Sequence, residues 1–593
     1  MVRGMSKLSL LGSAAVLLMM SGATAESGLQ ETDEQISMQP NMKERSPSSQ
    51  NIERQADPKL SQQTHTLEID SGVSLIVGGR EVRTLDGSGN NVDHPEWGSA
   101  FSHLVRMGFP DYSDGVSAMA GALRASAREV SNAVSNQPPG VTIPNPMNAT
   151  DFVWQWGQFL DHDIGLTDGL HEQADILVPF GDPWFDPNNT GMATIPFNRA
   201  LYDDDTGTHT ENPREQENEI TAWIDGSMVY GSSRERLDVL KVGPNSAHFE
   251  LSYGQLLPFN VQNIANANGF VSDPTTLFVA GDVRANEQVG LAAMHTLFAR
   301  EHNRLVLRHK RLNPEHGPRE VFEGARRLTI GQIQHITYTE FLPALIGPDA
   351  LPPYEGYKPD VHPGLYNEFS SAAYRMGHSM INTHILRLNK SGGEIKEGHL
   401  SLREAFFTAP SVINRKKAID PIFRGLASQP HQRIDTMIVD DLRNFLFGQP
   451  GQGGLDLASI NIQRGRDHGL PCYNDMREIM GLPRATSFAD VTSNLALQTA
   501  LASVYPTVDD IDLWVGGLAE DPMIEVGSQV GPLLREIIIK QFTALRDGDR
   551  FWYESYLEPE ELQFVRRRTL AKVIRTNTGV GHELQDDVFH MPE

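Results

Sequence analysis

The chain has 593 residues, of which 39% are hydrophobic and 21% charged, and its formal net charge is −26. This composition excludes a wholly disordered, collagen-like or coiled-coil protein. The excess of acidic residues predicts a negative surface, which argues against nucleic acid or an anionic membrane as a partner. A single cysteine, Cys472, excludes an intramolecular disulfide, so packing and bound groups must stabilise the fold.

The N-terminus has the pattern of an export signal. Arg3 and Lys7 precede an apolar run, Leu8 to Gly22, and the small-x-small cleavage pattern Ala23-Thr24-Ala25 follows. The alternative is an N-terminal membrane anchor, but the run is short for a span and ends in small residues. We therefore expect residues 1–25 to be a signal peptide. The mature chain would carry a charge of −28, have no membrane span and be secreted, either extracellular or periplasmic.

The rest of the chain divides into a polar segment and one large domain. Residues 26–65 are rich in Gln, Ser, Glu, Asp and Pro, which predicts a flexible polar leader. From residue 66 onward apolar residues recur at helical spacing, as in the sets Leu291, Met294, Phe298, Leu305 and Leu533, Ile537, Phe542, Leu545. No repeat or composition break interrupts this part. We predict a single mainly α domain over 66–593, with long loops and little β structure.

The first chemically dense segment runs from Trp154 to Asp163. On a helix, Gln158 would lie beside Asp161 and His162, three and four residues further on, so three polar side chains would converge on one rim. A capped helix end with a hydrogen-bonded histidine is the structural alternative.

Three further segments also allow a purely structural interpretation. Arg284 and Glu287, in the segment Gly281 to Glu287, could share a helical face and form a local ion pair. Tyr374 to His378 places a small residue directly before a histidine, which would let a flat, bulky group approach. Asn461 to Pro471 is the fourth dense segment.

Together these segments resemble, in the same order, the animal-type haem peroxidases of the peroxidase-cyclooxygenase superfamily. Arg83 to Gly87 and Leu545 to Trp552 add two further matching segments near the ends of the domain. Six segments in register leave little room for coincidence. The resemblance is closest to the peroxidase branch. It implies an all-helical haem enzyme that reduces hydrogen peroxide to water through a ferryl intermediate and oxidises halides, thiocyanate or phenolic donors.

The resemblance implies a role for each distal residue. His162 would be the base that takes a proton from peroxide and returns it to the departing oxygen, and its near-neutral pKa suits both transfers. Arg284 would stabilise the negative charge that develops as the O–O bond breaks. Gln158 would orient peroxide or a halide by hydrogen bonding.

The resemblance also implies how haem b would be held. His378 would be the proximal iron ligand, and Asn461 would accept a hydrogen bond from the other ring nitrogen, which should keep the iron strongly oxidising. Arg375 would pair with a haem propionate. Asp161 and Glu287 match the two carboxylates that form ester bonds to the haem; solvated or paired acids are the alternative.

A calcium site is implied beside the distal histidine. Asp163 directly follows His162, and the other ligands would come from one extended loop whose alternate residues point the same way, with the Trp223 carbonyl joining them. The implied loop ligands are Thr221, Trp223, Asp225 and Ser227. A simple turn containing Asp-Gly-Ser is the alternative.

The remaining candidate residues receive structural interpretations. His302 and His468 have no catalytic counterpart and are expected to be structural hydrogen-bonding groups. A zinc site is disfavoured because there is no His-Glu-x-x-His and only one cysteine, and Cys472 itself is expected to be a small apolar filler. The chain lacks the disulfides of mammalian members. It also carries Gln288 where the chlorinating mammalian member has a methionine that bonds to haem.

Three functions remain open. The first is the peroxidase. The second is a fatty-acid dioxygenase, whose radical tyrosine lies three residues before the proximal histidine; that position here is Arg375, with Tyr374 one residue away. The third is a non-catalytic adhesion protein, which the intact His162, Arg284 and His378 and the absence of an Arg-Gly-Asp tripeptide argue against.

Overall fold

The computed structural model describes residues 75–592, apart from the side chains of Leu170 and His171. The expected signal peptide (1–25) and polar leader (26–65) lie outside the described residues. Within 75–592, no helix is both long enough and apolar enough to cross a membrane.

The described chain is mainly helical, which confirms the predicted fold class. The longer helices are α2 (Ala127–Val134), α3 (Phe152–Ile164), α6 (Val289–Leu312), α7 (Pro318–Ile336), α14 (Leu457–Asp467), α17 (Leu495–Val504), α19 (Pro532–Asp547) and α22 (Leu570–Asn577). The shorter α-helices are α4 (Ser227–Tyr230), α5 (Arg234–Leu240), α8 (Leu342–Ile346), α9 (Asn367–Ser371), α10 (Leu402–Ala405), α11 (Ala409–Val412), α12 (Asp420–Leu426), α13 (Asp440–Arg443), α15 (Tyr473–Ile479), α16 (Phe488–Val491), α18 (Leu513–Ala519), α20 (Tyr553–Tyr556) and α21 (Pro559–Val565).

Four 3₁₀ segments and one π turn complete the helical part of the described residues: η1 (Pro274–Thr276), η3 (Ala373–Met380), η4 (Val508–Asp510), η5 (Ile524–Val526) and the π turn η2 (Thr337–Phe341). The strands form two-stranded pairs. The antiparallel pairs are β1 (Ile76–Val77) with β2 (Arg80–Glu81), β3 (Ser102–His103) with β8 (Glu217–Asn218), β4 (Gly169–Gln173) with β7 (Asn198–Ala200), β5 (Ile176–Leu177) with β6 (Thr194–Ile195), and β9 (His384–Ile385) with β10 (Leu400–Ser401). The strands β11 (Gln449–Pro450) and β12 (Gly453–Gly454) pair in parallel.

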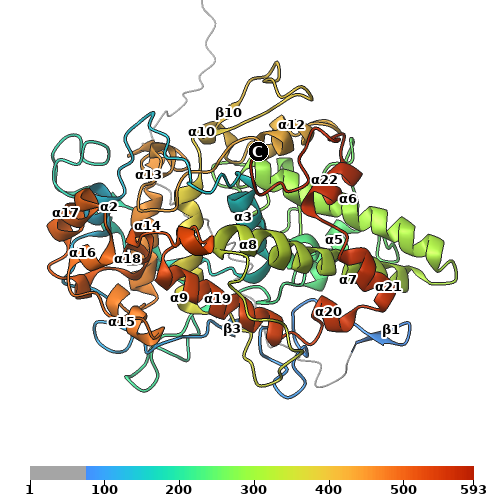
Figure 1. The fold of residues 1–593 in the computed structure, drawn as a ribbon, viewed down its shortest axis with the longest axis horizontal. Coiled ribbons are helices and arrows are strands. Elements are labelled where there is room, and N and C mark those ends of the chain that lie inside the picture. Colours follow the sequence, from blue (N-terminus) through green and yellow to red (C-terminus); the bar gives the residue numbers. More distant parts are fainter. Residues whose placement is uncertain (1–74, 593) are drawn as a thin grey trace, which may run out of the picture. The chain divides into compact units, whose positions relative to one another are not determined.

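The long helices α6 and α7 pack against each other, and α6 also packs against α3 and α22 (Figure 1). Gln288 caps the N-terminus of α6, because its side chain accepts a hydrogen bond from the Gly290 N–H. The last turn of α6 is basic, as the helix dipole favours. A side chain at Gly324 of α7 would collide with the His309 ring of α6. The glycine therefore allows the two helices to approach closely.

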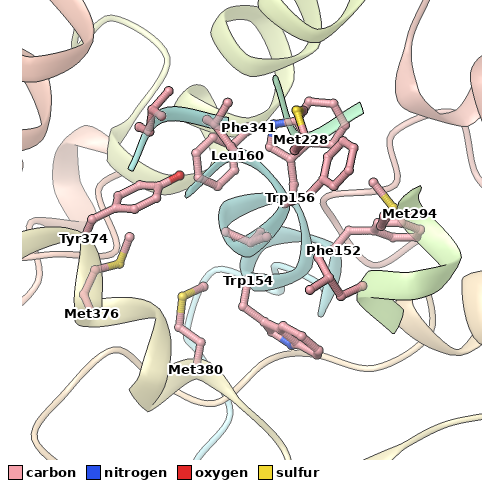
Figure 2. Close-up of a cluster of buried hydrophobic side chains, with 14 of the residues drawn as sticks. Phe152, Trp154, Trp156, Leu160, Met228, Met294, Phe341, Tyr374, Met376 and Met380 are labelled. Carbon is pink, nitrogen blue, oxygen red and sulfur yellow. The ribbon is translucent and has the colours of Figure 1, made fainter. Parts of the chain in front are cut away.

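α3 is almost entirely buried, because its apolar side chains form part of the core. Trp156 and Phe159 contact Phe298 of α6, with ring centroids 5.9 and 5.1 Å apart. Figure 2 shows the opposite neighbour, η3, from which Met380 projects towards Trp154. Packing on both sides fixes the rotation of α3, and with it the direction of the polar residues near its C-terminal end.

Candidate active site

A cavity of about 290 Å³ is lined by α3, η3, α14 and the loop that precedes α6. Apolar side chains make up much of its wall. It brings together most of the residues that the sequence predicts at a haem, which are Gln158, Asp161, His162, Arg284, Glu287, Arg375 and His378. Asn461 does not line the cavity but contacts His378.

The distal pair is organised by a carboxylate that the sequence analysis did not assign. Asp282 accepts hydrogen bonds from the backbone N–H, Nε and Nη2 of Arg284, each at 2.8 Å. The same carboxylate lies 3.4 Å from Nδ1 of His162. All three side chains are at least 95% buried. The two residues predicted to act on peroxide are thus held by one buried anion.

The electrostatics of this group keep Asp282 ionised. Burial alone would favour the neutral acid, but the Arg284 guanidinium and the His162 ring hold the pKa of Asp282 well below its ordinary value. In return, Asp282 raises the pKa of Arg284 against the effect of burial. Arg284 therefore remains a fixed cation at the cavity wall.

The segment that carries Arg284 and Glu287 is a turn and not a helical face. Arg284 N–H bonds to the Asp282 side chain, and Glu287 N–H bonds to the Arg284 carbonyl at 2.8 Å. The expected helical face shared by Arg284 and Glu287 is therefore wrong. An Asp two residues before an Arg, in a glycine-led turn, is the sequence signal that could have identified Asp282.

The half-buried Gln158 is hydrogen-bonded to a network of side-chain amides. Gln288, 4% exposed, donates from Nε2 to Gln155 at 2.8 Å and to Gln158 at 3.0 Å. Its Oε1 accepts from the Gly290 N–H at 2.5 Å. The residue that the sequence analysis noted only for the missing methionine thus ties the start of α6 to α3.

His378 and Arg375 lie on η3, a 3₁₀ segment and not an α-helix. Nδ1 of His378 lies 2.8 Å from Nδ2 of Asn461, while Oδ1 of Asn461 accepts from Nη1 of Arg375 at 3.2 Å. The predicted acceptance of a hydrogen bond by Asn461 would require the opposite amide orientation, with Arg375 released from Oδ1.

Asp161 and Glu287 both line the cavity. The Asp161 side chain is 38% exposed and its Oδ2 lies 3.7 Å from Nη1 of Arg284, so the carboxylate and the guanidinium share one wall. Both acids are therefore placed where a large ligand in the cavity would pass beside them.

The predicted calcium ligands lie together, but the local geometry differs from expectation. Ser227 Oγ bonds to the carbonyl and to Oδ1 of Asp163, at 2.7 and 3.0 Å, and Ser227 N–H bonds to Asp225 at 3.0 Å. The loop is not extended, because Gly226 has a φ of 76° and Ser227 begins α4. The turn, rather than strand-like alternation, brings Asp225 and Ser227 against Asp163 of α3, and Thr221 lies beside Asp225.

Two carboxylates and several neutral oxygens make up this set, and all of its side chains are buried. Burial and the facing Asp225 raise the pKa of Asp163 well above its ordinary value. Burial raises the pKa of Asp225 to about 6, although Arg83 and Arg326 oppose the shift. No group of three or more His, Cys, Asp or Glu within 75–592 is arranged to hold a metal ion. A cation here would depend on hydroxyl and carbonyl ligands as well.

The other singled-out residues make structural contacts. His302 lies 3.0 Å from both the Tyr230 hydroxyl and the Ala247 carbonyl. His468 lines the cavity and contacts Asn367 and Ser371 at 2.7 and 3.0 Å. Burial raises the pKa of the Cys472 thiol to about 12 against the effect of Arg124, so the thiol stays protonated.

Comparison with known proteins agrees with this geometry. A buried histidine–arginine pair and a second histidine share one cavity of a mainly α domain, and the comparisons identify the chain as a haem peroxidase. The sequence model of the animal haem peroxidase family matches residues 82–589, and the chain belongs to that family.

Individual relatives support the assignment. Peroxinectin A of Dictyostelium discoideum is 37% identical over 540 residues, covering 87% of this chain and 96% of its own. Pig thyroid peroxidase is 35% identical and covers 84% of this chain, which spans 59% of the thyroid protein. The structure of peroxidase A from Dictyostelium discoideum superposes with a TM-score of 0.79 at 36% identity, covering 86% of this chain and 100% of the other.

Fatty-acid α-dioxygenases share the fold. The rice enzyme superposes with a TM-score of 0.72 at 20% identity, over 88% of each chain. In η3, with about three residues per turn, Arg375 shares a face with His378. Tyr374 lies about a third of a turn from that face, although it also lines the cavity. The position expected of a radical tyrosine is thus occupied by an arginine.

Proposed function

We propose that this chain is a secreted haem peroxidase that oxidises small donors, namely halides, thiocyanate and phenols, at the expense of hydrogen peroxide. The observation that carries the proposal is the pair His162 and Arg284, held on Asp282 in the same cavity as His378. Export is proposed from the signal-like segment at residues 1–25.

The residues of the cavity fit a haem group. His378 offers an imidazole, the preceding Gly377 leaves open space where a side chain would stand, and apolar residues line much of the wall. His378 would bind the iron and Arg375 a propionate. Haem, when bound, supplies the iron at which peroxide is reduced and through which electrons are drawn from the donor.

The distal residues would divide the work on peroxide. With Nδ1 directed at Asp282, His162 keeps Nε2 for the substrate, accepts a proton from one peroxide oxygen and returns it to the other. Arg284, fixed by its three bonds to Asp282, stabilises the charge that develops on the departing oxygen. Gln158 orients the incoming molecule.

Two further features belong to the proposal. Asp161 and Glu287 would form ester bonds to haem, which would keep the group in a secreted enzyme that produces strong oxidants. Asp163, Thr221, Trp223, Asp225 and Ser227 would bind Ca²⁺ through hard oxygen ligands. Both follow from the placement of these residues and from the family resemblance.

The decisive experiment is stopped-flow absorption of the haem-loaded protein, mixed first with peroxide and then with a donor. We expect a rapid Soret change with peroxide and its reversal by iodide, thiocyanate or a phenol. Because Gln288 cannot form the sulfonium bond to haem, bromide and iodide should turn over well above chloride. A protein that ignores peroxide but consumes oxygen with linoleate would be a dioxygenase instead.

A further inference from the structure

The orientation of the Gln158 amide is determined by a chain of hydrogen bonds that begins at a backbone group. The N–H of Gly290 can only donate, so the Gln288 atom that faces it at 2.5 Å must be the oxygen. The Gln288 amino group then points the other way. Its two hydrogens meet the side-chain oxygens of Gln155 and Gln158.

The same series of hydrogen bonds determines which group of the Gln158 amide remains available to the cavity. Because the oxygen of Gln158 accepts from Gln288, its amino group is the part of the amide that remains to be offered elsewhere. Gln158, Gln288 and Arg284 all line the cavity, whereas Gln155 is fully buried and does not line it. The cavity is therefore presented with N–H donors from an amide and a guanidinium.

We infer that Gln288 is a positioning residue that makes Gln158 a hydrogen-bond donor and so favours anionic donors, such as bromide and thiocyanate, over neutral phenols. The inference rests on the proposed function and extends it to the choice of substrate. A Gln158 amide free to turn over would present its oxygen half of the time, and an oxygen repels an anion. The hydrogen bond from Gln288 prevents this rotation of the Gln158 amide.

Gln288 has a second role, because its side chain also caps the N-terminus of α6. The test separates the positioning of Gln158 from this capping. Gln288→Ser keeps a hydroxyl that can accept from the Gly290 N–H but is too short to reach Gln158. Gln288→Met loses both contacts. Gln155→Met is the matched control, because Gln155 shares the same partner but lies outside the cavity.

Thiocyanate binding to the haem-loaded protein is followed by the Soret shift, and KM and kcat are measured for bromide and for a neutral phenol. In Gln288→Ser we expect the thiocyanate Kd and the bromide KM to rise roughly tenfold, the scale of a lost bond to a charged group. The phenol KM should stay unchanged. Gln288→Met should add a loss of thermal stability, and Gln155→Met should lower stability alone.

Unchanged thiocyanate Kd and bromide KM in Gln288→Ser would overturn the inference, as would an equal rise for the phenol, because a general distortion of the cavity would then explain both. A wild-type enzyme that binds thiocyanate but does not react with peroxide would instead overturn the proposed function. The binding titration would still test the positioning role.

Discussion

Asp282 shows how one buried side chain can position two others. A buried carboxylate is costly unless it is paired and hydrogen-bonded, and Arg284 meets that need with three bonds. The His162 ring then lies against an anion that cannot move away. We therefore expect the neutral ring to carry its proton on Nδ1, on the side of Asp282, which would leave Nε2 available to accept a proton.

His162→Ala should slow the reaction with peroxide by roughly 10² to 10⁴-fold, because the variant loses the group that moves the proton. The rate of the Soret change in stopped flow measures this. His94→Ala is the control, since that histidine is exposed and outside the cavity. If His162→Ala reacts with peroxide at the wild-type rate, His162 is not the group that moves the proton.

Asp282→Asn should slow the same reaction by less than His162→Ala does. An asparagine can still accept from Arg284, but it no longer carries the charge that holds the His162 ring. Haem content should remain near wild type, because Asp282 does not line the cavity. If peroxide kinetics in Asp282→Asn match the wild type, the carboxylate serves only to fold the loop.

Covalent attachment of haem can be tested at Asp161 and Glu287. After cycling with peroxide, acidic organic extraction should leave colour on the wild-type protein and strip it from Asp161→Val, Glu287→Gln. The reason is that an ester bond survives extraction, whereas axial ligation and packing do not. Complete loss of haem from the wild type would return both acids to a structural role.

At the scale of elements, the periodicity of the sequence predicted those helices whose formation depends on residues close together in the chain. The spacing of Gln158, Asp161 and His162 indicated α3, and the apolar sets beginning at Leu291 and Leu533 indicated α6 and α19. The turn from Arg284 to Glu287 and the 3₁₀ form of η3 were not predicted, because hydrogen bonds to single side chains and packing override the local pattern there.

The relation of Asp282 to His162 was beyond sequence reasoning for a different reason. The two residues lie 120 positions apart, and only the packing of the loop before α6 against α3 brings them within 3.4 Å. The cavity residues were found through family resemblance, since each segment alone allowed a structural interpretation.

Removal of calcium should destabilise helix α3 as a whole. Asp163 follows His162 on that helix and is joined to the loop at Ser227, so a cation there would brace the helix against α4. Chelation should lower haem content and the thermal midpoint together, because the ion stabilises the native state and scarcely binds the unfolded one. Elemental analysis that finds no calcium in active protein would end this idea.

The molecule as a whole holds its large fold together without a disulfide, and within residues 75–592 buried ion pairs join distant segments. Arg128 of α2 bonds to Asp182 and Asp456, with all three side chains fully buried. Asp512 accepts from both Arg466 and Arg124 and from the Tyr505 hydroxyl. Loss of one partner of such a pair strongly destabilises the fold, because a charge is left buried alone.

Asp512→Asn should therefore lower the unfolding free energy of the haem-loaded enzyme at pH 7 by about 3 kcal/mol or more. Although burial opposes ionisation, Arg466 and Arg124 lower the pKa of Asp512 from 3.8 to about 2. The native state thus binds fewer protons than the unfolded state in this range. The ionised carboxylate contributes stability above pH 4, worth about 2 kcal/mol through this shift, and loses it as the pH falls from about 4 to 2.

Urea unfolding at pH 7, 4 and 3 measures the difference in unfolding free energy between wild type and Asp512→Asn, and the pH dependence of that difference. The difference between wild type and Asp512→Asn should be largest at pH 7 and shrink towards pH 2, since a protonated aspartate is nearly as neutral as asparagine. Asp475→Asn is the matched control, because its 2.6 Å pair with Arg484 is exposed and should change stability by less than about 1 kcal/mol. An offset that stays constant from pH 7 to pH 3 would mean that Asp512 acts through its hydrogen-bond geometry and not through its charge.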